Sequence, residues 1–149
     1  MNLNMTNNQY INAYKKTQQS TNAVTSSHEI VRALMRELLN SMQKIVLDIQ
    51  DERKRKQDQF KLDKVFEEKN ARHRSKNLSK SLSIIYGLQT SLDFDKALEI
   101  ANNLFQLYEY CRHEIIKGFS QKIEDGIVKA IDVIKQILEG WEVLPSLEK

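Results

Sequence analysis

Residues able to act in catalysis or to bind a metal are few in this chain and stand far apart. The histidines are His28, His73 and His113. None shares a helical face with another histidine, a cysteine or a carboxylate at ligand spacing, so the sequence predicts no metal site. Glu99, Glu109 and Glu114 are ten and five residues apart, a spacing that does not bring two carboxylates together for acid–base work. We expect no catalysis, no cofactor and no small-molecule substrate.

The single cysteine belongs to an apolar stripe near the C-terminus. Steps of four and three separate the members of this stripe, which are Ala97, Ala101, Leu104, Tyr108, Cys111 and Ile115. After Gly118 a second stripe repeats the same steps with Ile123, Ile127, Ala130, Ile134, Ile137 and Trp141. Apolar residues every 3.5 positions in a polar chain can be buried only against other helices. The stripes predict an antiparallel helical hairpin that breaks at Gly118, with a buried, inert thiol at Cys111.

The elements that position these stripes form a helical domain. The chain has 149 residues with 4 glycines and 1 proline, too few turn formers for a β-sandwich or barrel. Apolar periodicity and breaks predict four helices at about 27–52, 60–90, 95–117 and 120–143. Ser26 and Glu29 have the spacing of a capping box for the first helix, and Asp93 or Asp95 can cap the third. Short connections predict an all-α, antiparallel up-down four-helix bundle.

Two segments lie outside this regular pattern. Residues 1–25 are rich in Asn, Gln, Thr and Ser, which predicts a mobile N-terminal arm ahead of a single bundle domain at 26–149. Its anchoring side chains are Tyr10, Ile11 and Tyr14. Residues 51–76 hold ten basic and six acidic residues and predict an extended charged helical hairpin tip. The i,i+4 pairs Glu52–Lys56 and Glu68–Arg72 favour its helices. The tip is either a solvated end or a basic patch for acidic protein, a membrane surface or RNA.

The third predicted helix carries more large apolar residues than one stripe can use. Those off the stripe are Phe94, Leu98, Ile100, Phe105, Leu107 and Tyr110. A central helix with three neighbours explains part of this surplus, and a groove for another amphipathic segment explains the rest. No apolar run approaches the roughly 20 residues that cross a bilayer, and the N-terminus shows no secretion signal. We therefore expect a cytoplasmic protein that binds through apolar surface.

Several motifs resemble those of the flagellin export chaperone family (FliS). Ser91–Lys96 (SLDFDK) and Ala101–Tyr110 (ANNLFQLYEY) are similar to the family's S-L-D-x-[ED]-x and A-x-N-L-x-x-L-Y-x-Y elements. Asn77–Ile85 resembles its N-x-x-K-A-x-x-I-I element, and Leu138–Trp141 its terminal L-x-x-A-W. The segment from Leu39 to Asn77 is longer than the family's by roughly four or five helical turns.

This resemblance implies a non-catalytic chaperone that holds the disordered C-terminal region of flagellin, prevents early polymerisation and delivers it to the export gate. The expected residues that line or buttress the flagellin-binding groove are Leu92, Phe94, Ile100, Leu104, Leu107, Tyr108, Cys111 and Ile115. The resemblance also suggests that the arm, through Tyr10, Ile11 and Tyr14, partly covers the groove and contacts the export gate. Two alternatives stay open: a scaffolding bundle that self-associates, and weak nucleic-acid binding through the basic tip.

Overall fold

Four helices account for almost all of the chain that the structure describes. The computed structural model describes residue 11, residues 27–57 and residues 64–147. Its helices are α2 (Ser27–Gln57), α3 (Lys64–Thr90), α4 (Leu98–Gln121) and α5 (Asp125–Leu147). The described residues form no strand. The predicted all-α class is confirmed. Within the described residues, no helix combines the length and the apolar character needed to cross a membrane.

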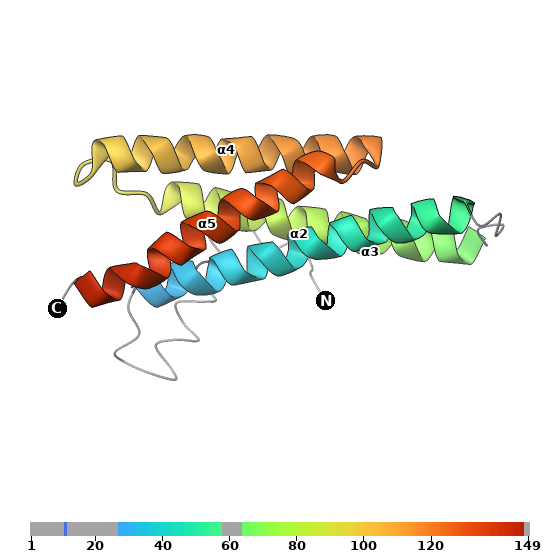
Figure 1. Cartoon of the computed structure of the whole chain (residues 1–149), viewed down its shortest axis with the longest axis horizontal. Coiled ribbons are helices and arrows are strands. Elements are labelled where there is room, and N and C mark those ends of the chain that lie inside the picture. The colour runs from blue at the N-terminus through green and yellow to red at the C-terminus, as the bar shows by residue number, and fades with distance from the viewer. Residues whose placement is uncertain (1–10, 12–26, 58–63, 148–149) are drawn as a thin grey trace.

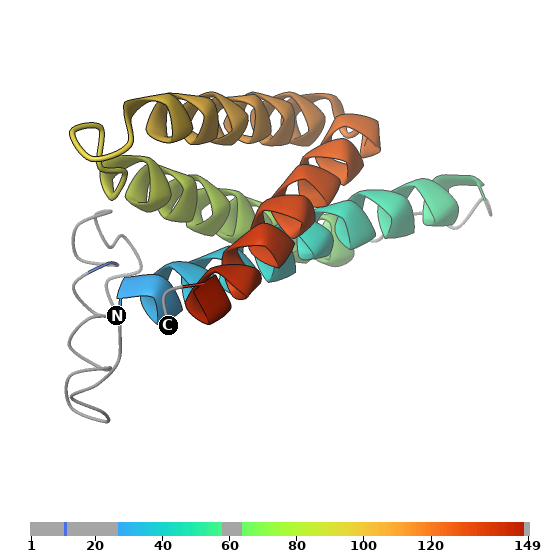
Figure 2. The ribbon, with the colours of Figure 1, turned by 60° about the vertical axis from the view of Figure 1, so that its left-hand side comes forward.

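The helices are arranged as an up-down bundle in which each one packs against two others. α2 packs against α3 and α5, and α4 packs against the same two helices. Successive helices run in opposite directions, and α5 crosses α2 obliquely (Figure 1). The turned view shows α4 lying over α3, while the α2–α3 hairpin continues past the α4–α5 turn (Figure 2). The predicted four-helix bundle is therefore confirmed.

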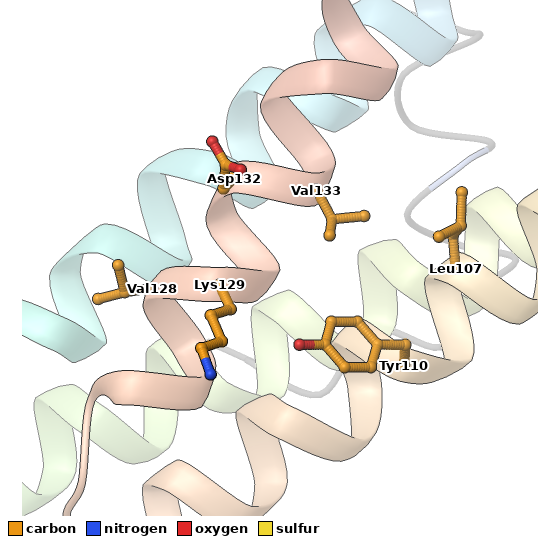
Figure 3. Close-up of a pocket in the computed structure, with 6 residues that line it drawn as sticks. All are labelled: Leu107, Tyr110, Val128, Lys129, Asp132 and Val133. Atoms are coloured by element: carbon orange, nitrogen blue, oxygen red, sulfur yellow. The ribbon is translucent and has the colours of Figure 1, made fainter.

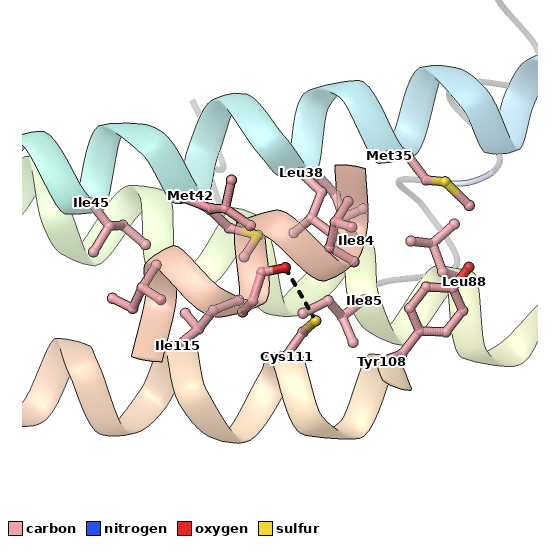
Figure 4. Close-up of a cluster of buried hydrophobic side chains, with 14 of the residues drawn as sticks. Met35, Leu38, Met42, Ile45, Ile84, Ile85, Leu88, Tyr108, Cys111 and Ile115 are labelled. Atoms are coloured by element: carbon pink, nitrogen blue, oxygen red, sulfur yellow. Dashed lines mark hydrogen bonds between the residues drawn. The ribbon is translucent and has the colours of Figure 1, made fainter. Parts of the chain in front are cut away.

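The apolar stripes meet in one core between the helices (Figure 4). Tyr108, Cys111 and Ile115 of α4 are buried there, among side chains of the other three helices. These partners include Leu38, Met42, Ile45, Ile84, Ile85, Ile127 and Ile134. The Cys111 Sγ lies 3.7 Å from the Ala130 carbonyl oxygen, to which the thiol donates. Period-3.5 patterning thus produced the burial that it predicts along the middle of both stripes, whereas their first members, Ala97 and Ile123, are exposed.

The start of α4 differs from the prediction. The Asp93 carboxylate accepts hydrogen bonds from the backbone N–H groups of Asp95 (3.1 Å) and Lys96 (3.0 Å). These bonds close a separate turn, so α4 begins at Leu98 rather than near residue 95. Neither aspartate caps α4, because its N-cap is Ala97 and has no side-chain capping hydrogen bond. A local side-chain bond to the backbone competed successfully with the helix.

The predicted break at Gly118 is wrong. α4 continues through Gly118 to Gln121 and ends at Lys122, whose φ of 55° is left-handed. Gly118 is needed for close packing instead: a Cβ there would lie 2.6 Å from the Ile127 side chain and 2.7 Å from the Ile123 carbonyl oxygen. Glycine lets the first turn of α5 fold back tightly onto α4.

The charged segment forms the outer end of the α2–α3 hairpin, and its first helix runs to Gln57 rather than 52. The base of this outer end contains buried charged groups and is not fully exposed to solvent. Glu52 and Arg74 are almost fully buried and form an ion pair with each other. Lys122 Nζ donates to Glu52 at 3.0 Å, and Arg53 pairs with Glu124. This polar layer ties both hairpin helices to the α4–α5 turn.

A second clamp joins the opposite end of the bundle. The rings of His28 and Trp141 stack with centroids 5.1 Å apart and an interplanar angle of 7°. The Trp141 indole N–H donates to the His28 carbonyl oxygen at 2.9 Å, and His28 Nε2 lies 2.5 Å from the Trp141 carbonyl oxygen. The start of α2 and the end of α5 are thereby held together. Ser26 of the predicted capping box lies outside the described residues.

Candidate functional site

The surplus of apolar surface predicted for α4 is present. Ile100 and Leu98 are 63% and 61% exposed. Leu107, Tyr110 and Ile116 are each more than a third exposed. The buried stripe of α4 faces the core, so these side chains occupy its two flanks. α4 therefore offers more apolar surface than its neighbours in the bundle cover, and such a surface is typical of a binding site.

One flank of α4 forms an open depression with α5 (Figure 3). The depression has a volume of about 620 Å³ and is lined by Leu107, Tyr110, Val128, Lys129, Asp132 and Val133. Leu107 and Tyr110 come from α4, and the other four come from consecutive turns of α5. Two valines, a leucine and an aromatic ring supply the apolar surface, with one cation and one carboxylate beside them. This combination suits the apolar side of an amphipathic segment, whose polar groups can pair with Lys129 and Asp132.

The sequence-predicted site residues divide into three groups. Leu107 lines the depression, and Ile100 lies seven residues earlier on the same flank of α4. Phe94 is exposed before α4, and its ring meets Phe105 edge-on with centroids 6.3 Å apart. Leu92 and Leu104 are half-buried against the core. The structure therefore gives Ile100, Leu107 and Phe94 surfaces that a partner can reach.

The third group, Tyr108, Cys111 and Ile115, lies inside the bundle. Their side chains have at most 2% of their surface exposed. Burial, with a smaller contribution from Glu114, raises the pKa of the Cys111 thiol to about 12. Burial likewise raises the pKa of Tyr108. The predicted buried thiol is confirmed. In this arrangement the three residues can pack beneath the exposed apolar surface of α4 but cannot line it.

The α5 side of the depression was missed by sequence reasoning. Val128 and Val133 lie directly beside Ile127 and Ile134, which belong to the buried stripe. Periodicity assigns such positions to the edge of a stripe and does not say which helix lies beyond it. Tyr110 was identified as surplus but not as part of the site. The signal available in the sequence was the extra apolar residue on each side of an already complete stripe.

The other flank of α4 borders α3 and is partly polar. Gln89 of α3 donates to the Glu109 carboxylate at 2.9 Å, and Arg112 pairs with the same carboxylate at 3.0 Å. The hydrogen bonds from Arg112 and Gln89 hold the pKa of Glu109 below its usual range. Leu98 and Ile116 remain exposed on either side of this cluster along α4.

The N-terminal arm is represented by Ile11. Its side chain rests on Gly87 of α3, where a Cβ would lie 3.0 Å from the Ile11 Cδ1 atom. Ile11 therefore contacts α3. Tyr10 and Tyr14 lie outside the described residues. Gly87 lies inside α3 and permits the close approach of Ile11.

The three histidines have separate neighbours in the described part of the chain. Among those residues, no group of three or more His, Cys, Asp or Glu side chains could hold a metal ion. His28 is engaged with Trp141, His73 lies 2.5 Å from the Asp48 carboxylate, and His113 is exposed near Glu114. The fold and site together define an all-α bundle protein with an open apolar surface on α4.

Comparison with known proteins identifies the family of this chain. The model of the flagellar protein FliS family matches residues 10–147. The chain belongs to this family, one of chaperones rather than enzymes.

Two curated relatives carry the name flagellar secretion chaperone FliS. The relative from Vibrio cholerae serotype O1 is 28% identical over 72 residues, which cover 48% of this chain and 53% of the relative. The relative from Salmonella typhimurium is 33% identical over 66 residues, covering 44% of this chain and 49% of the relative. The matches thus span about half the length of these relatives. No solved structure matches the chain.

Proposed function

We propose that this protein is a cytoplasmic flagellar secretion chaperone that binds the disordered C-terminal region of flagellin. In this role it prevents premature polymerisation and delivers its client to the export gate. Membership of the FliS family supports the chaperone role. The observation that supports α4 as the client-binding site is its exposed apolar surface, centred on Leu107 and the depression shared with α5.

The surface must extend beyond the depression to hold such a client. A disordered segment that folds on binding loses about 2–5 kcal/mol to ordering. Interfaces of this kind bury more than about 2,000 Å² in total, and an interface of ordinary size already takes roughly 20–30 residues a side. The depression has only six lining residues. We expect the client to follow α4 from Phe94 past Ile100 and Leu107, with apolar side chains against the exposed flanks.

The arm regulates this binding in our proposal. Residues 1–25 act as a mobile arm on the bundle domain at 26–149, and Tyr10, Ile11 and Tyr14 anchor it when the client is absent. The seat of Ile11 on Gly87 supports an anchored state of the arm. Displacement of the arm by the client frees these residues for the export gate. Deletion of residues 1–20 should raise client affinity and weaken gate binding, and no change in either would rule this coupling out.

The direct test is titration of the protein with a peptide of the flagellin C-terminal region. We expect a 1:1 complex by light scattering and a rise in helix content by circular dichroism. A homo-oligomer that persists without taking up peptide would instead support the scaffolding alternative, in which the same apolar surface of α4 joins copies of this chain. Co-purification with flagellins from the source cell then identifies the client.

A further inference from the structure

The outer end of the α2–α3 hairpin projects from the bundle (Figures 1 and 2). The α4–α5 turn meets the hairpin at its base, where Lys122 donates to Glu52 and Arg53 pairs with Glu124. Arg74 of α3 lies at the same level, paired with Glu52. Residues 64–73 of α3 lie beyond this level and span about 15 Å of helix. The chain therefore presents a tip that reaches past its other two helices.

Contacts between the two helices hold the tip in a defined shape. The Arg55 guanidinium lies 3.9 Å from the centroid of the Phe66 ring. Asn70 Nδ2 donates to the Asp48 carbonyl oxygen at 3.4 Å, and the His73 ring contacts the Asp48 carboxylate. Burial opposes ionisation of Glu52, but hydrogen bonds from Lys122 and Arg74 outweigh it and lower the pKa of this carboxyl. The charges of residues 64–73 are thus displayed on a stretch of α3 that is held against α2.

These internal pairs use acidic groups and leave a row of cations without an ion-pair partner among the described residues. The predicted Glu68–Arg72 pair is not formed. Asp48, Asp51 and Glu52 are engaged within the hairpin. Lys69, Arg72 and Lys76 are exposed and form no ion pair with any described residue. Steps of three and four place them on one face of α3, over about 10 Å of helix. We name these three residues the basic stripe.

We propose that the basic stripe docks an acidic helical segment of a partner protein. A second helix that carries carboxylates at steps of three and four presents them in the same geometry, so each can face one cation of the stripe. The stripe lies on α3 near the tip, whereas the depression lies between α4 and α5. An acidic partner and an apolar client can therefore bind at the same time. This proposal does not depend on the identity of the client.

The spacing of charge favours a protein segment over a polyphosphate. Glu68 lies four residues before Arg72, beside the stripe, and is exposed. A continuous array of phosphates would be repelled by this carboxylate, whereas a helix whose carboxylates are spaced to face the three cations leaves it facing solvent. Three cations neutralise few phosphates.

The test is fluorescence anisotropy with a labelled alanine-based helical peptide of about 20 residues that carries glutamates at steps of three and four. The stripe variant is Lys69→Glu, Arg72→Glu and Lys76→Glu combined. The matched control is Lys44→Glu, Lys117→Glu and Lys135→Glu combined. It changes the net charge equally at three exposed cations elsewhere. A third variant carries glutamine at the three stripe positions, which removes the cations without adding repulsion.

We expect the stripe variant to bind the peptide at least about tenfold more weakly at physiological salt, the glutamine variant several-fold more weakly, and the control within twofold of the unmodified protein. Circular dichroism should be unchanged in all three. Equal weakening by the stripe variant and the control would overturn the proposal, because net charge alone would then explain binding. Tighter binding to duplex DNA or to vesicles with anionic lipid than to the peptide would also overturn it.

Discussion

Substitution of Ile100 by aspartate tests whether this exposed residue of α4 contacts the client. Ile100 is 63% exposed on the flank that continues into the depression. Leu47 on α2 is 61% exposed and lies on a different helix. Ile100→Asp and Leu47→Asp therefore remove a similar apolar side chain, add the same charge and differ chiefly in location. If α4 holds the client, the first variant alone should lose affinity.

The expected loss follows from the exposure of Ile100. Complete burial of an isoleucine side chain stabilises by about 1.5–3 kcal/mol, so a client that covers the exposed 63% gains about 1–2 kcal/mol. Aspartate forfeits this gain, and desolvating its carboxylate without a partner costs a further 1–3 kcal/mol or so. The combined loss corresponds to affinity at least about 30-fold weaker. Because the residue contacts solvent in the free protein, stability should change by no more than about 0.5 kcal/mol.

Isothermal titration calorimetry with the flagellin C-terminal peptide measures this difference, and thermal unfolding checks the fold. Ile100→Asp should bind at least about 30-fold more weakly than Leu47→Asp, with both variants melting close to the unmodified protein. Equal affinities of the two variants would refute the assignment of the surface to α4. Extensive unfolding of Ile100→Asp would show instead that the residue belongs to the core.

Three further outcomes follow from the structure. Glu52→Gln should lower the free energy of unfolding by about 1–3 kcal/mol in urea titrations. Since the pKa of Glu52 is lowered, its contribution to stability is present above the ordinary carboxyl range and is lost as pH falls through the lowered value. The free energy of unfolding of the variant should therefore fall less than that of the unmodified protein as the pH is lowered. Gly87→Ala should displace the Ile11 side chain and increase proteolysis of the arm, while Gly140→Ala, with no atom within 4 Å of the added Cβ, should leave it unchanged. Cys111 should react with a thiol reagent at pH 8 only after unfolding, because burial raises its pKa to about 12; rapid labelling of the folded protein would contradict this.

The class of fold could be predicted because periodicity is a local property. Spacing of 3.5 residues identified the stripe with Tyr108 and Cys111, and both side chains are buried as expected. Helix ends were less accurate, because single local bonds decide them. The Asp93 carboxylate holds a turn of its own and delays α4 to Leu98. Gly118 was mistaken for a break because a glycine in a sequence does not reveal whether it serves a turn or a close contact.

By itself the sequence determined that four amphipathic helices form and that the helix containing Leu107 has surplus apolar residues. It also supplied the family motifs and the excess of positive charge between residues 51 and 76. Only the tertiary structure decided which residues meet across helices. It brought Val128 and Val133 beside Leu107 and paired Glu52 with Arg74. The physical reason is that a stripe fixes which face of a helix avoids water, whereas the crossing of two helices fixes what that face meets.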